Sequence, residues 1–74
     1  MKNTANHQEA FLNKLCQEQI PCTLFLMNGF QMRGIILAHD NFVLIVEVDG
    51  RQQMIYKHAV STVCPHLALD ISDL

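Results

Sequence analysis

A change in sequence pattern after Pro21 constrains the fold of this chain more than any other feature. From there on, turn-forming residue pairs recur about every 8–12 positions, a spacing typical of a small β-barrel or β-sandwich. The pairs are Asn28-Gly29, Asp40-Asn41, Asp49-Gly50 and Lys57-His58. The pattern therefore predicts five strands, over residues 22–27, 30–39, 42–48, 51–56 and 59–64.

Glycines indicate a tight turn at one place and a bend at another. Asp49-Gly50 suits a two-residue hairpin turn, because both residues tolerate a positive φ. Gly34 interrupts the longest predicted strand, where a bulge or a sharp bend lets a sheet curl. We therefore expect a curled five-stranded sheet.

The residues before Pro21 have the spacing of an amphipathic helix. Asn6 and Glu9 are placed like a capping box, in which Asn6 accepts from the backbone and Glu9 reaches back. Apolar residues then recur at helical spacing, at Phe11, Leu12 and Leu15. Since a proline cannot continue a helix, we predict a helix over residues 7–19 that ends because of Pro21.

The third predicted strand has too many apolar residues for a strand with one wet face. Residues 42–46 read Phe-Val-Leu-Ile-Val, so this strand must be covered twice or lie near a subunit boundary. Half of the 74 residues are hydrophobic, which is more than one small core hides. Open β edges also need partners. We therefore predict self-assembly in which each subunit extends its neighbour's sheet.

Composition narrows the class of protein. Three cysteines without a CxxC pair argue against a disulfide scaffold and for a reducing cytoplasm. No signal peptide opens the chain, and no apolar run approaches the ~20 residues needed to span a bilayer, so no membrane association is expected. A net charge of −2 is low for a nucleic-acid-binding domain. Any such binding must depend on where the few cations lie, on stacking and on backbone donors.

Several short motifs then occur in the order and spacing of one family. They are Phe11-Leu12-Asn13, Asn28-Gly29 before a strand with Gly34, Asp40-Asn41-Phe42, and Tyr56-Lys57-His58-Ala59-Val60-Ser61-Thr62. Over about residues 6–66 the chain resembles bacterial Hfq, an Sm-like family, and in particular its short Gram-positive members. The resemblance implies a helix followed by a strongly bent five-stranded antiparallel Sm-like barrel. It also implies a ring of six subunits that acts as an RNA chaperone on small RNAs and mRNAs in post-transcriptional regulation and the stress response.

The resemblance implies two RNA-binding faces on that ring. The proximal face takes U-rich RNA, and its residues here are Gln8, Asn41, Phe42, Tyr56, Lys57 and His58. Phe42 offers a ring for base stacking, while Lys57 and His58 supply donors for phosphate or base oxygens. Asn41 stands where many members have glutamine, so its reach toward a uracil edge is shorter.

The distal face takes A-rich RNA. Its residues here are Phe25, Asn28, Gly29, Phe30, Gln31, Met32, Arg33, Gln53, Ser61 and Thr62. Phe25 and Phe30 are expected to frame an adenine, with Met32 as an apolar wall. Gln53 carries both a donor and an acceptor for the adenine edge.

The resemblance divides the chain into an N-terminal extension (1–6), the Hfq/Sm-like domain (7–66) and a short C-terminal tail (67–74). The tail shows no strong period, which predicts a loosely held end. The arginine-rich patch that many members carry after the helix is replaced by Cys16-Gln17-Glu18-Gln19. Since annealing of two RNAs depends on such cations, binding is better supported than annealing.

Other interpretations remain open at this point. Taken alone, Phe25, Phe30 and Phe42 are more typical of a core. Cys64-Pro65-His66 with His39 or His7 lacks the paired spacing of a zinc site, and His58 near Ser61 lacks an orienting acid. No enzyme, metal or cofactor is therefore expected. The competing functions are a structural or protein-interaction ring with little RNA affinity, and a small β-barrel with another ligand.

Overall fold

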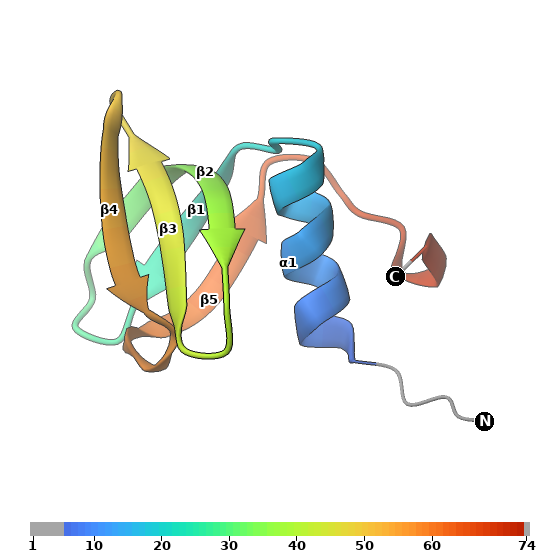
Figure 1. Ribbon diagram of the computed structural model, residues 1–74, viewed down its shortest axis with the longest axis horizontal. Helices are drawn as coiled ribbons and strands as arrows, with labels where there is room; N and C mark the ends of the chain where they lie inside the picture. The colour runs from blue at the N-terminus through green and yellow to red at the C-terminus, as the bar shows by residue number, and fades with distance from the viewer. Residues whose placement is uncertain (1–5, 74) are drawn as a thin grey trace.

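One helix precedes five antiparallel strands in the computed structural model, which describes residues 6–73 (Figure 1). These elements are α1 (His7–Gln17), β1 (Cys22–Leu26), β2 (Gln31–His39), β3 (Val43–Val48), β4 (Arg51–Tyr56) and β5 (Val60–Pro65), with 3-10 turns η1 (Lys57–Ala59) and η2 (Ile71–Asp73). The five predicted strands are confirmed to within one residue at each end. Most of the predicted N-terminal extension, residues 1–5, and Leu74 of the predicted tail lie outside the described residues.

The helix begins at the predicted residue but ends earlier than predicted. The Asn6 side chain accepts a hydrogen bond from the Glu9 N–H at 3.0 Å. At the other end α1 stops at Gln17, two residues before the predicted end. There Gln19 has a φ of 50°, its N–H bonds to the Cys16 carbonyl at 3.3 Å, and the Ile20 N–H bonds to the Leu15 carbonyl at 3.1 Å. This is a Schellman motif, so the local backbone ends the helix before Pro21 can.

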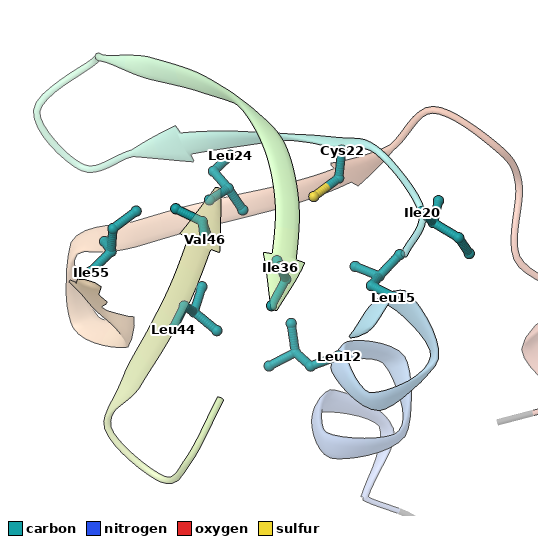
Figure 2. Close-up of a cluster of buried hydrophobic side chains, with 9 residues drawn as sticks. All are labelled: Leu12, Leu15, Ile20, Cys22, Leu24, Ile36, Leu44, Val46 and Ile55. Atoms are coloured by element: carbon teal, nitrogen blue, oxygen red, sulfur yellow. The ribbon is translucent and has the colours of Figure 1, made fainter. Parts of the chain in front are cut away.

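The strands form one sheet in the order β4-β3-β2-β1-β5. Residues 31–34 of β2 pair with β1, and residues 35–39 pair with β3. Gly34 is the last residue of the first group, which fits the predicted bend. The strand β2 curves over the core (Figure 2). The irregular register lies further on, between Ile36 and Ala38.

Gly34 is required because β2 and β3 approach closely at the bend. A Cβ at this position would collide with the backbone carbonyl oxygen of Glu47 on β3. By contrast, the Asp49-Gly50 turn needs positive φ values, 53° and 78°, which confirms the predicted hairpin.

The core lies between the bent sheet and the helix. Its residues are Leu12, Leu15, Ile20, Cys22, Leu24, Ile36, Leu44, Val46 and Ile55 (Figure 2). Leu12 and Leu15 of α1 point toward Ile36 of β2, so the helix closes one side of the sheet (Figures 1 and 2). In the tail, Leu69 packs against the same core. Just before the tail, the His66 side chain lies 2.9 Å from the Thr23 hydroxyl.

β3 has one buried and one half-buried face. Leu44 and Val46 are almost fully buried, whereas Val43 and Ile45 are half-buried. On the neighbouring β4, Tyr56 pairs with Val43 and Met54 with Ile45, and both β4 side chains are more than half exposed. The outer face of β3 and β4 is therefore apolar and largely uncovered in the single chain.

Candidate nucleic-acid interface

The turn between β2 and β3 holds an exposed aromatic ring in a fixed position. One carboxylate oxygen of Asp40 accepts from the backbone N–H groups of Phe42 and Val43, both at 2.8 Å. These bonds, led by that from Phe42, hold the pKa of Asp40 below its ordinary value. The turn presents the Phe42 side chain with 75% of its surface exposed, so Phe42 is not a core residue.

The η1 turn docks directly on this loop. The Lys57 N–H bonds to the Phe42 carbonyl at 2.7 Å. The rings of Tyr56 and His58 stack with centroids 5.5 Å apart and 10° between their planes. Asn41 lies exposed within the loop. The structure thus brings most of the predicted proximal residues to one corner of the molecule, named here the Phe42 corner.

Gln8 reaches the same region from the helix. It lines a groove of about 480 Å³ between α1, η1 and β5, together with Lys57. The other residues lining the groove are His7, Phe11, Leu12, Leu44, Val60, Ser61, Thr62, Val63 and Ile71. Six of these eleven lining residues are apolar, and Gln8 and Lys57 are among the five polar ones.

Two further residues belong to the Phe42 corner that sequence reasoning did not assign to it. His39 Nε2 lies 2.7 Å from Asn13 Oδ1, and His39 Nδ1 lies 3.5 Å from Lys57 Nζ. These residues come from α1, β2 and η1. No sequence signal identifies such a contact, because 26 and 18 residues separate its members.

The predicted distal residues cluster at the β1–β2 turn. The Asn28 side chain accepts from the Phe30 N–H at 3.0 Å, and Gly29 has a φ of 93°. The Phe30 carbonyl accepts from the Leu26 N–H at 2.8 Å. Phe30 is 69% exposed, so it too is not a core residue.

A row of side chains extends from this turn across three strands. Phe25 on β1 pairs with Gln31 on β2 and with Thr62 on β5. Residues directly opposite in antiparallel strands share a face, so these three side chains lie together. The Ser61 hydroxyl donates to the Phe25 carbonyl at 3.1 Å, and Phe25 itself is half-buried.

The remaining predicted distal residues do not all lie near Phe25. Met32 pairs with the buried Leu24 and packs against the core. With Gln31, Arg33, Val48 and Asp49 it also lines a cavity of about 410 Å³. Gln53 lies on β4, opposite Val46, in the other half of the sheet. A single chain therefore does not bring Gln53 together with the row around Phe25.

Metal binding and membrane-spanning helices are two further features that distinguish classes of protein. Among residues 6–73, no group of three or more His, Cys, Asp or Glu side chains is placed to hold a metal ion. In the same part of the chain, no helix has the length and apolar character required to cross a bilayer.

The helix and bent five-stranded antiparallel sheet define a protein of the Sm-like fold class. The family model described as Hfq protein matches residues 7–70. The curated RNA-binding protein Hfq of Anoxybacillus flavithermus is 58% identical over 65 residues, 88% of each chain. That of Alkaliphilus oremlandii is 49% identical over 72 residues, 97% of this chain and 90% of the relative.

A solved structure of an Hfq protein is also similar to this chain. The crystal structure of the pleiotropic translational regulator Hfq superposes with a TM-score of 0.78 and 41% sequence identity. The superposition covers 80% of this chain and 98% of that one. The chain belongs to the Hfq family, as the motifs around Phe42 and Lys57 predicted.

Proposed function

We propose that this protein is a non-catalytic RNA chaperone that binds single-stranded RNA on two faces of a homohexameric ring. In the cytoplasm it would hold small RNAs and mRNAs and change their pairing, stability or translation. The observation that carries the proposal is the exposed Phe42, fixed by Asp40 and bonded through its carbonyl to the Lys57 N–H. The curated relatives named RNA-binding protein Hfq support it.

The Phe42 corner has the chemistry to bind U-rich RNA. An exposed aromatic ring stacks on a base and contributes about 1–3 kcal/mol per base. Lys57 provides a cation for a phosphate, and the amides of Gln8 and Asn41 provide donors and acceptors for a uracil edge. The stacked pair of Tyr56 and His58 borders the same corner. These groups make up the proposed proximal face.

The row around Phe25 has the chemistry to bind A-rich RNA. Phe25 and the exposed Phe30 offer two rings at the β1–β2 turn, whose shape depends on Asn28 and Gly29. Gln31, Ser61 and Thr62 add hydrogen-bonding groups near Phe25. Met32 and Arg33 line the adjoining cavity. These groups, with Gln53, make up the proposed distal face.

The two sheet edges support assembly into a ring. β4 and β5 are the terminal strands of the sheet, and open edges pair readily with another chain. One side presents exposed Met54 and Tyr56 on β4, and the other presents the apolar groove beside β5. Two different surfaces that fit each other produce a head-to-tail contact, which closes into a ring when the rotation allows. Pairing of β4 with the next subunit's β5 would place Gln53 in one sheet with that subunit's Ser61 and Thr62.

Fluorescence anisotropy with short oligo-U and oligo-A RNAs tests the proposal, on protein whose mass is measured by light scattering. We expect tight binding of both RNAs by a species of about six subunit masses. Phe42→Ala should weaken oligo-U binding and Phe30→Ala oligo-A binding, each by about tenfold or more, as expected for loss of one stacking contact. The two variants serve as controls for each other.

Lys57→Ala tests whether the positive charge of Lys57 contributes to RNA binding. It should weaken oligo-U binding much more than oligo-A binding, because Lys57 lies at the Phe42 corner. Equal losses for the two RNAs would contradict the assignment of two faces. No binding of either RNA would leave the family fold with another function.

A second function is favoured by the charge of the chain. The net charge is −2, and Lys14 at the end of α1 pairs with Glu18 at 2.8 Å. A structural or protein-interaction ring with little RNA affinity fits this balance. The same titration distinguishes the two functions, because such a ring would have the mass of the hexamer and little affinity for either RNA.

A further inference from the structure

His39 stands between the helix and the cation of the Phe42 corner. On one side its Nε2 atom lies 2.7 Å from the Asn13 side-chain oxygen in α1. On the other side its Nδ1 atom lies 3.5 Å from the Lys57 ammonium group. His39 and Lys57 are both partly buried, so the imidazole is held in place by two neighbours.

The two contacts specify one form of the imidazole ring. An amide oxygen only accepts hydrogen bonds, so Nε2 must carry a proton and donate to Asn13. An ammonium group only donates, so Nδ1 must present a lone pair to Lys57. Both conditions are met together only by the neutral ring with its proton on Nε2. A second proton on Nδ1 would remove the acceptor and place a positive charge against Lys57.

The other neighbours of His39 come from the adjacent residue of the chain, from β3 and from α1. Asp40 follows directly in the chain and lies near both His39 and Lys57. The strand partner of His39 on β3 is the buried, apolar Leu44. From α1, the contact is the uncharged Asn13, while the adjacent Lys14 has Glu18 as an ion-pair partner.

We propose that neutral His39 holds Lys57 back toward α1, and that protonation of His39 releases Lys57 to RNA phosphate. His39 is thus a positioning residue for Lys57. Since histidine changes its charge between about pH 5 and 8, U-rich RNA binds more tightly as the pH falls through that range. The inference rests on the proposed binding of U-rich RNA at the Phe42 corner and adds pH control to it.

His39→Gln is the variant that tests the proposal, because glutamine keeps an acceptor for Lys57 and takes up no proton. Between pH 8 and pH 6, the oligo-U affinity of the wild-type protein should rise about threefold to fivefold more than that of His39→Gln. This factor is the upper range for one partly solvated ion contact. The salt dependence at pH 6 should be steeper in the wild-type protein by about 0.7 in log–log slope, since one more phosphate is neutralised. A purely structural role of His39 would leave this slope unchanged.

Two controls isolate His39 from its surroundings. His58→Gln removes the other histidine of the corner, which stacks on Tyr56, and should leave the contribution of His39 to the pH profile intact. Oligo-A binding should show the same pH profile in the wild-type protein and in His39→Gln. Altered oligo-A profiles in His39→Gln would overturn the proposal, because the effect would not be local.

Nitrogen-15 NMR of the imidazole supplies a readout without RNA. We expect His39 at pH 8 to show the neutral form protonated on Nε2, and Asn13→Ala to shift this equilibrium toward the other tautomer. A ring protonated on Nδ1 at pH 8 would overturn the inference. The inference would also be overturned if His39→Gln had the same oligo-U pH profile as the wild-type protein. Absence of oligo-U binding by the wild-type protein would instead overturn the proposed function itself.

Discussion

At the residue scale, Gly34 and Asp40 illustrate two ways in which the backbone depends on one side chain. Gly34 is needed because any Cβ would collide with the carbonyl oxygen of Glu47 where β2 bends. Asp40 is needed because its carboxylate accepts from the N–H groups of Phe42 and Val43 in the turn. The first residue allows the sheet to bend, and the second gives Phe42 its exposed position.

Gly34→Ala is expected to lower the free energy of unfolding by about 3 kcal/mol, because overpacking against fixed backbone has a cost of this order. Urea unfolding at constant protein concentration measures the change. Gln31→Ala, at an exposed position at the start of the same strand, is the matched control and should change stability by less than about 0.5 kcal/mol. Equal midpoints for Gly34→Ala and the wild-type protein would show that β3 moves away without cost.

Asp40→Asn is expected to destabilise the protein in a pH-dependent way. Because the folded protein holds the pKa of Asp40 below its ordinary value of 3.8, the carboxylate stabilises the fold above that pH. This stabilisation is lost as the pH falls through the lower folded pKa. Thermal midpoints should therefore differ between variant and wild type at pH 7 and converge below pH 3.8. Glu47→Gln removes an exposed negative charge outside the turn and is the control for the loss of one charge.

At the element scale, the end of α1 shows local hydrogen bonds acting before proline does. Gln19 adopts a left-handed φ of 50°, a conformation that L side chains disfavour and glycine does not. The bond from the Ile20 N–H to the Leu15 carbonyl joins two buried residues. Burial of this apolar pair compensates for the unfavourable conformation of Gln19.

Gln19→Gly should raise the free energy of unfolding by about 0.5–1 kcal/mol, because glycine is the preferred residue at this position of a Schellman motif. Gln17→Gly, two residues earlier and still in the helix, is the matched control and should lower it by up to about 1 kcal/mol. Urea unfolding measures both. The same sign of change in both variants would contradict the helix end described above.

At the scale of the whole molecule, the exposed apolar surface is distributed unevenly. Met54 and Tyr56 are 55% and 52% exposed on the edge strand β4. The groove of about 480 Å³ lies along the opposite edge strand, β5. In the proposed ring, each of these two apolar surfaces would be covered by a neighbouring copy.

Met54→Lys should therefore reduce the mass measured by light scattering toward that of smaller species, because a charge would be buried at the proposed subunit contact. Leu67→Lys introduces the same charge at a residue of similar exposure, 60%, in the C-terminal segment, and should leave the mass unchanged. Loss of the assembly in both variants, or in neither, would contradict the placement of the contact on β4.

The helix, the strands and the family were predictable from local sequence patterns. The turn pairs at Asn28, Asp40 and Asp49 delimit the strands because turn chemistry is local: each depends on one to four residues adjacent in the chain. The capping role of Asn6 is local for the same reason. The family motifs around Phe42 and Lys57 are also contiguous in the sequence, which is why family membership was predictable.

The way in which the elements meet was not predictable from the sequence, because it depends on contacts between residues far apart in the chain. The place where β2 changes partner depends on the contact of Gly34 with β3. The exposure of Phe30 and Phe42 was implied by the family resemblance but not by the residues taken alone, because it depends on where their turns point. The contact of His39 with Asn13 and Lys57 joins three elements distant in sequence. Such contacts arise from packing of the whole chain, and residue spacing along the sequence carries no information about them.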